Sequence, residues 1–475
     1  MEGIMLTYNM EERKTASMYD YLYSCIKADI RSGKLSSGEK LPSKRTLSQH
    51  LKVSVITVQN AYALLEDEGY IYAVQKKGYF VSRVETVGSK EKPRQKSPKA
   101  SAVSSESTNE EIFLDLVNNR TESSLFPFSV WSRLMRLVLS EGDRSLLALS
   151  PNGGIKELRA AIAGYLYSFR GMDVSPEQII VGAGTEYLYD LIIKLLGRDK
   201  VFALENPGYS KIAKIYSTND VSYKYLDIDG NGIPADKLTE SRADVVHISP
   251  SHHYPTGIIT PISRRQELLY WAGEGSSRYI IEDDYDSELR FAARPIDTMF
   301  GIDTCGKVIY VNTFSKTLCP SMRISYMVLP EKLLETFRKK LGFYACTVPV
   351  FEQYTLAKFI SEGYFEKHIS RMKNHYRTLR DCTISAIESS AFASKVTIRE
   401  EKAGLHFLLH ADTRFSDAEL KEKALSRGIR ISCLSDYLMS ESKLYDGNIV
   451  INYSGIDVSK LRQAAERISE VFGLV

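Results

Sequence analysis

The sequence lacks the features that mark secreted, zinc-binding and membrane-spanning proteins. Its six cysteines are scattered, with no C-x-x-C pair and no histidines at metal-ligand spacing, which argues against a disulfide framework or a metal site. The N-terminal segment has no apolar core of signal-peptide length. No uncharged stretch reaches the ~18 residues of a membrane span. We therefore expect a soluble, cytoplasmic protein with no metal and no membrane partner.

The sequence also has little net charge. A formal charge of +3 at pH 7 means that any affinity for nucleic acid has to come from a local basic surface. What the chain does have is length, because 475 residues with ordinary apolar and charged fractions are too many for one typical domain. We therefore expect two or more domains.

One segment divides the chain. Residues 83–111 contain almost no large apolar residues and are rich in Ser, Lys, Pro and Glu, a composition that cannot bury enough surface to offset the entropy of ordering. We interpret residues 83–111 as a flexible linker between an N-terminal domain, residues 1–82, and a C-terminal domain, residues 112–475. The cations near its start leave open a second role, in which the linker touches DNA phosphates.

The N-terminal domain has the pattern of a helix-turn-helix. Apolar residues between Tyr19 and Ile30 recur at helical spacing. Ser43 and Ser54 are expected N-caps of two further helices, which the tight turn "KVS" separates. The segment "IYAVQKKGYFVS" then indicates two short strands with cations in the turn between them.

Residues 12–82 resemble the GntR-type winged helix-turn-helix. "GEKLPSKRTLSQHLKVS", "AYALLEDEGY" and "KKGYFV" occur in that family's order and spacing. The resemblance implies binding to operator double-stranded DNA, with phosphate contacts, a recognition helix in the major groove and a basic wing. The residues that it assigns to these contacts are Ser43, Lys44, Arg45, Ser54, Thr57, Gln59, Lys76 and Lys77. The family commonly carries Arg where this chain has Val55, so an operator sequence is not transferable.

The C-terminal part alternates strand-like and helix-like segments. "EQIIVGAGTEYLYDLIIKLL" indicates a strand, a glycine turn and a helix, "KVFALENPGYSKIAKIY" repeats that order, and the apolar runs before Asp283 and Thr313 are further strands. This rhythm predicts a doubly wound α/β fold. In such sheets ligands bind at the carboxyl ends of the strands.

Polar residues at these strand ends suit one cofactor, pyridoxal 5'-phosphate. The amine of Lys316 matches its aldehyde, and a carboxylate such as Asp283 keeps its pyridine nitrogen protonated. Tyr285, two residues further along an extended chain, points to the same side as Asp283 and suits the ring oxygen. A hydroxyl, a guanidinium and the free N–H groups of a helix start suit its phosphate. These phosphate-binding candidates are Thr313, Arg323, Gly184 and Thr185.

The region from residue 112 onward resembles the type I aminotransferase fold. The whole chain resembles the MocR-type regulators, the GntR branch that includes the γ-aminobutyrate regulator. "GGIKELRAAIA", "ENPGYSK", "SPSHHYPTG", "YIIEDDYDSE" and "TFSKTLCPSMRISYMVLP" stand in the family's order. The resemblance implies that Lys316 is the catalytic Schiff-base lysine, that Asp283 partners the pyridine nitrogen and that Tyr285 donates to the ring oxygen. It adds Tyr209 as the aromatic residue that stacks on the ring.

Two departures from aminotransferases bear on catalysis. Tyr254 stands before "PTG", where aminotransferases usually carry Asn, and Val450 stands where they carry an arginine for the substrate carboxylate. Arg399, Arg427 and Arg430 are open candidates for replacing that arginine. We therefore expect a sensor domain in which turnover is lost or reduced, with residual transaminase activity left open.

The sequence thus predicts a pyridoxal-phosphate-dependent, DNA-binding transcriptional regulator. It would sense an amine, an amino acid or the cofactor itself by aldimine exchange at Lys316. The alternative is a catalytically active aminotransferase with a DNA-binding appendage. A homodimer with exchanged DNA-binding domains is expected, because aminotransferase cores share active sites across an interface and winged helices bind paired half-sites.

Overall fold

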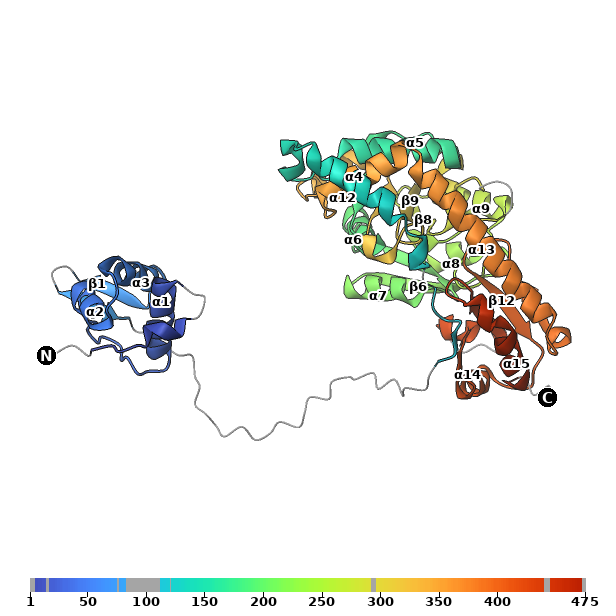
Figure 1. The fold of residues 1–475 in the computed structure, drawn as a ribbon. Helices are drawn as coiled ribbons and strands as arrows, with labels where there is room; N and C mark the ends of the chain where they lie inside the picture. The colour runs from blue at the N-terminus through green and yellow to red at the C-terminus, as the bar shows by residue number, and fades with distance from the viewer. Residues whose placement is uncertain are drawn as a thin grey trace. The chain divides into compact units, whose positions relative to one another are not determined.

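The computed structural model describes residues 5–13, 17–74, 77–82, 112–119, 121–291, 296–439 and 445–471. The chain forms two compact units, Met1–Glu106 and Ser107–Val475 (Figure 1). The expected linker, residues 83–111, lies outside the described residues, and so does Lys76.

The first unit consists of three helices followed by a hairpin. They are α1 (Met18–Arg31), α2 (Lys44–Leu51), α3 (Val55–Asp67), β1 (Ile71–Val74) and β2 (Gly78–Val81), after a short 3-10 helix, η1 (Met10–Arg13). Ser43 caps α2 by accepting a hydrogen bond from the amide of Thr46, and Ser54 caps α3 by accepting one from the amide of Thr57. These caps satisfy amides that a helix start leaves without an intrahelical partner.

The buried faces of the three helices form the core of the first unit. Leu22, Ile26 and Ile30 of α1 are buried at the spacing that places residues on one helical face. They share a core with Leu47 of α2 and Leu65 of α3. β1 and β2 pair antiparallel, so the unit has the helix-turn-helix and wing that the sequence predicts.

A seven-stranded sheet organises the second unit. Its order is β4-β10-β9-β8-β7-β5-β6. β10 runs antiparallel to both of its neighbours, and the other pairs are parallel. The strands are β4 (Ile179–Gly182), β5 (Val201–Asn206), β6 (Ser222–Asp227), β7 (Val245–Ile248), β8 (Tyr279–Asp283), β9 (Val308–Thr313) and β10 (Ser325–Val328). The predicted α/β architecture is confirmed.

Helices cover both faces of this sheet (Figure 1). They are α4 (Phe128–Ser140), α5 (Lys156–Arg170), α6 (Thr185–Leu196), α7 (Ser210–Thr218), α8 (Ala235–Ser241), α9 (Ile262–Glu274), α10 (Met299–Ile302), α11 (Glu331–Leu341), α12 (Val350–Ser361) and α13 (Tyr364–Glu388). Buried residues of α6, α7 and α11 share one hydrophobic layer with Ile281 of β8, whereas its neighbour Ile280 packs with α8 and α9. Successive side chains of a strand alternate between faces, so Asp283 lies on the face that α6 and α7 cover.

A smaller antiparallel sheet forms the C-terminal part of the second unit. Its order is β11-β12-β15-β14, from β11 (Val396–Arg399), β12 (His406–Ala411), β14 (Ser432–Cys433) and β15 (Asn448–Asn452), with α14 (Asp417–Ser426) and α15 (Leu461–Val471). A separate pair, β3 (Leu114–Asp115) and β13 (Ile429–Arg430), runs parallel and joins the start of the unit to its C-terminal part. In the described part of the chain no helix is long and apolar enough to cross a membrane.

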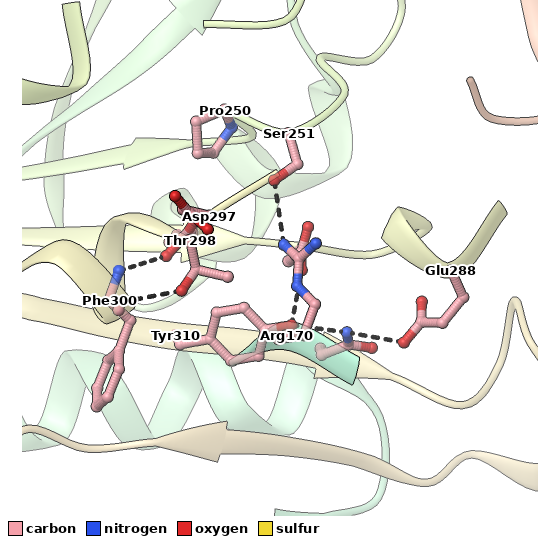
Figure 2. Close-up of polar contacts among 12 residues, drawn as sticks. Arg170, Pro250, Ser251, Glu288, Asp297, Thr298, Phe300 and Tyr310 are labelled. Atoms are coloured by element: carbon pink, nitrogen blue, oxygen red, sulfur yellow. Dashed lines mark hydrogen bonds and ion pairs between the residues drawn. The ribbon is translucent and has the colours of Figure 1, made fainter. Parts of the chain in front are cut away.

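A buried polar network holds the segment that follows β8. Arg170, the last residue of α5, forms an ion pair with Asp284 at 2.8 Å, and both side chains are 1% exposed. Tyr310 of β9 donates to the same carboxylate at 2.6 Å, and Arg170 also donates to Ser251 at 3.4 Å (Figure 2). A buried carboxylate without such partners is costly. The network therefore sets the position of the chain at the carboxyl end of β8.

Candidate functional site

A cavity of about 370 Å³ opens at the carboxyl ends of four strands in the second unit. Its lining includes Glu205 of β5, His247 of β7, Asp283 of β8 and Thr313 of β9. This is the edge at which open α/β sheets bind ligands. The cavity is therefore the candidate functional site of the second unit.

Residues predicted from the sequence to bind the cofactor meet in this cavity. Seven of the eight line it: Lys316, Asp283, Tyr285, Tyr209, Thr185, Thr313 and Arg323. The eighth, Gly184, caps α6 with a φ of 96°, a backbone conformation that residues with a Cβ rarely adopt. A Cβ at Gly184 would overlap the guanidinium of Arg323, so a larger residue there would displace the Arg323 side chain from the helix start.

Lys316 follows β9 and forms hydrogen bonds with a residue that is far away in the sequence. Its amine donates to the backbone oxygen of Asn119 at 2.7 Å and to the side-chain oxygen of Asn119 at 3.0 Å. Burial lowers the pKa of Lys316 to about 8, against the charge of Asp286, which raises it. The neutral amine is the nucleophilic form, so Lys316 suits attack on an aldehyde near neutral pH.

Asp283 has one carboxylate oxygen in use and one free. Its Oδ2 accepts a hydrogen bond from the hydroxyl of Tyr189 at 2.6 Å, and Nε2 of His247 lies 3.6 Å from the same oxygen. Its Oδ1 is buried and has no partner among the described residues. Because a buried acceptor without a donor is costly, this oxygen fits the N–H of a protonated ring nitrogen.

Aromatic side chains form another part of the wall. The rings of Tyr209 and Tyr254 are perpendicular, with centroids 6.0 Å apart, and the hydroxyls of Tyr254 and Tyr437 lie 2.9 Å apart. The hydroxyl of Tyr285 lies 3.4 Å from Nδ1 of His252. Tyr254, at the position where aminotransferases usually carry Asn, therefore lines the cavity with an aromatic ring.

Glu205 and the neighbouring His253 form a part of the cavity wall that carries no net charge. Burial raises the pKa of Glu205 to about 8, and its carboxyl accepts a hydrogen bond from the amide of Ser249 at 3.0 Å. Nε2 of His253 lies 3.5 Å from Glu205, and burial lowers the pKa of His253 to about 3. Near pH 7 Glu205 is therefore largely protonated and His253 is neutral. The sequence reasoning missed both residues, although "ENPGY" and "SPSHHYPTG" flag their segments.

Two cations and a carboxylate meet beside the start of α6. Arg323 and Lys211 each form an ion pair with Glu186, and all three residues line the cavity. Of these only Arg323 was predicted from the sequence. Lys211 and Glu186 were missed because a helix start by itself does not show which charged neighbours reach it.

Two hydroxyls near Lys316 differ in their availability. The Thr313 hydroxyl accepts hydrogen bonds from Ser325 at 2.8 Å and from the amide of Ser315 at 3.1 Å. The Ser315 hydroxyl oxygen is buried, lines the cavity and has no partner among the described residues. Ser315 is therefore the more available hydroxyl of the two, and it was not predicted from the sequence.

The three arginines considered as replacements for a carboxylate-binding arginine lie elsewhere. Arg427 forms an ion pair with Glu470 at 2.5 Å, and Arg430 lies 3.5 Å from Asp115. Arg399 belongs to β11. None of the three is among the described residues that line the cavity.

The candidate DNA interface lies in the first unit. Arg45 is exposed in the first turn of α2, Gln59 is exposed in the second turn of α3, and Lys77 is exposed in the hairpin turn. The ammonium of Lys44 lies over the ring of Tyr79 at 5.1 Å, a cation–π contact that joins the start of α2 to β2. The first turn of α3 also exposes two apolar side chains, Val55 at 42% and Ile56 at 68%.

Comparison with known proteins assigns both units. Residues 18–81 match the family "Bacterial regulatory proteins, gntR family", and residues 114–468 match "Aminotransferase class I and II". Similar proteins include the uncharacterized HTH-type transcriptional regulator YdeL of Bacillus subtilis (strain 168), 35% identical over 95% of this chain and 96% of the relative. The probable rhizopine catabolism regulatory protein MocR of Rhizobium meliloti is 30% identical over 96% of this chain and 94% of its own.

A solved structure supports the fold of the second unit. The multiple substrate aminotransferase from Thermococcus profundus superposes with a TM-score of 0.68 at 22% identity, covering 77% of this chain and 92% of that protein. At this identity the likeness concerns the fold. An aminotransferase class I and II fold implies binding of pyridoxal 5'-phosphate.

We expect Lys316 to react with a small acylating reagent at a lower pH than an ordinary lysine. Because its pKa is lowered to about 8, the labelling rate measured by peptide mass spectrometry should rise around that pH and then level off. In the urea-unfolded chain the pKa of the same lysine should be about 10.4. The free energy of unfolding should therefore gain from this group as the pH rises from about 8 to about 10, where the unfolded chain binds more protons. A folded-state midpoint equal to the unfolded one would contradict the assignment.

Proposed function

Because this chain belongs to the MocR-type regulators of the GntR family, with a GntR helix-turn-helix followed by an aminotransferase class I and II domain, we propose that it controls transcription through a ligand bound at Lys316. The ligand is a primary amine, an amino acid or pyridoxal 5'-phosphate itself. Residues 1–82 form the DNA-binding domain of this proposal, and residues 112–475 form the ligand-binding domain. One observation carries it, the meeting of the Lys316 amine and the free Asp283 oxygen in one cavity.

The lining residues suit pyridoxal 5'-phosphate part by part. When bound, this cofactor supplies an aldehyde on which primary amines exchange and a ring that stores electrons. In the proposal Lys316 supplies the resident amine, Asp283 holds the proton on the ring nitrogen, and Tyr285 donates to the ring oxygen. Tyr209 stacks on the ring.

The cofactor's phosphate would be held at the start of α6 and beside Lys316. The residues that would bind it are Arg323, Thr313 and Ser315 through their side chains, and Gly184 and Thr185 through their backbone amides.

The contact between Lys316 and Asn119 offers a route for the signal. Asn119 lies a few residues after β3, in the first segment of the second unit along the chain. Asn452 of β15 donates to the backbone oxygens of Leu116 and Val117 in the same segment, at 3.1 and 3.3 Å. A ligand that takes the place of the Lys316 amine changes the contact with Asn119. It thereby favours one conformation of the segment that leads to the DNA-binding domain, which is what a switch requires.

We also propose that the regulator is a homodimer. Leu147, Leu149 and Phe343 of the second unit are 84%, 85% and 79% exposed, which favours a surface that a second copy covers. Winged-helix domains bind paired half-sites, and this also calls for two copies. The protein loaded with pyridoxal 5'-phosphate should sediment at micromolar concentration with twice the mass of the chain. A monomer under these conditions would show the proposal to be wrong.

The DNA-binding residues can be sorted by salt dependence. Replacing Lys44 and Arg45 together by Ala should weaken binding to all DNA sequences alike. It should also reduce the slope of log affinity against log salt concentration by about one to two, because a variant with fewer phosphate contacts releases fewer counterions on binding. Gln59→Ala should instead change the preference at one base pair, by about 1–3 kcal/mol. Fluorescence anisotropy with the upstream DNA of the chain's own gene and with a scrambled duplex, at several salt concentrations, measures both. An unchanged slope in the double variant would rule out these phosphate contacts.

The central test is Lys316→Ala. The loss of this side chain removes no core volume, so the fold should persist. Because the contact with Asn119 is lost as well, the operator affinity should take one fixed value, and its response to pyridoxal 5'-phosphate and to a panel of amines should disappear. Lys339→Ala, a change at an exposed lysine of α11, is the matched control and should respond like the parent. If the Lys316→Ala protein still changes its operator affinity with the same ligand as the parent does, covalent exchange at this lysine is not the signal.

A further inference from the structure

The two cations at the proposed phosphate site are already paired with a carboxylate of the same chain. Nη2 of Arg323 contacts Oε2 of Glu186, and Nζ of Lys211 contacts Oε1. Each carboxylate oxygen of Glu186 therefore faces its own cation. All three residues line the cavity, so the contact lies where a ligand's anionic group would bind.

The position of Glu186 in α6 strengthens this arrangement. Glu186 is the second residue of a helix of 12 residues, where free N–H groups and the helix dipole favour negative charge. Gly184 caps the helix, and its lack of a Cβ lets the guanidinium of Arg323 lie directly against the helix start. A carboxylate, a guanidinium, an ammonium and free amides thus gather at one place.

Glu186 carries its charge at neutral pH. Burial raises the pKa of its carboxyl, but the hydrogen bond from Lys211 and the charges of Arg323 and Lys211 lower it by more, so the pKa lies below its usual value. A phosphate that binds the same two cations brings further negative charge next to this carboxylate. Like charges a few ångströms apart repel each other, so the two anions compete for the same cations.

We propose that Glu186 is an internal competitor for the cofactor's phosphate and that Lys211 is a phosphate ligand beside Arg323. The inference rests on the proposed function, because it takes the phosphate to be that of pyridoxal 5'-phosphate. The phosphate binds Arg323 and Lys211 by taking them over from the Glu186 carboxylate. Glu186 thereby weakens the hold on the cofactor and lets it exchange with the cofactor in solution.

Glu186→Gln tests the competition, because glutamine keeps the shape of the side chain and removes its charge. The full-length variant should bind pyridoxal 5'-phosphate about tenfold more tightly than the parent, which corresponds to about 1.4 kcal/mol. Its affinity for inorganic phosphate, measured by isothermal titration, should rise as well. Its affinity for pyridoxal, which lacks the phosphate, should stay as in the parent. Absorbance titration measures the two aldehydes.

Two further variants separate competition from general effects. Glu177→Gln makes the same change of charge at a carboxylate that pairs with Arg159 at 2.9 Å and does not line the cavity, and it should leave all three affinities unchanged. Lys211→Met should weaken binding of pyridoxal 5'-phosphate and of phosphate several-fold and leave pyridoxal unaffected. In that background the gain from Glu186→Gln should shrink, because the two residues act on the same anion.

The outcomes distinguish this inference from the proposed function. Equal or weaker binding of phosphate and of pyridoxal 5'-phosphate by Glu186→Gln would overturn the inference and make Glu186 a support for Arg323. If no variant binds pyridoxal 5'-phosphate, the proposed function fails. The phosphate titration then decides alone whether Glu186 competes for this anion site.

Discussion

The buried ion pair between Arg170 and Asp284 is the contact on which the rest of the site depends. Asp284 directly follows β8, and its carboxylate is held by Arg170 of α5 and by Tyr310 of β9. Consecutive residues of an extended chain face opposite sides, so fixing Asp284 on one side of the sheet turns Asp283 toward the cavity on the other. Removing one partner of such a buried pair leaves a charge without compensation, at a cost of about 3–5 kcal/mol. The buried ion pair of Asp284 therefore orients the neighbouring Asp283 carboxylate toward the cavity.

The same strand ends explain how far the sequence alone could predict the site. Short apolar runs that stop at polar residues place Asp283, Thr313 and Lys316 at the carboxyl edge of a sheet, and the structure brings them together there. The predicted family and α/β fold are confirmed. In the first unit the serines of "LPSKR" and "KVSV" cap α2 and α3 as expected, because capping depends on residues within one turn. Strand ends and helix caps, which depend on residues close together in the sequence, were thus predictable.

Contacts between distant segments were not predictable in this way. Asn119 reaches the amine of Lys316 from 197 residues away in the chain, and Glu186 meets Arg323 across 137 residues. Such pairs depend on how helices and strands pack, and no periodicity in either segment encodes them. The residue roles at the cofactor and the DNA remain predictions, and the linker and Lys76 lie outside the described residues.

The pairing of β3 with β13 joins the start of the second unit to its C-terminal part. Residues 114–119 lie near the N-terminal side of this unit, and they are hydrogen-bonded to the C-terminal part and to Lys316. Coupling free energies are reciprocal. In the proposed regulator, any change that alters the contact of this segment with Lys316 therefore alters ligand affinity by the same free energy.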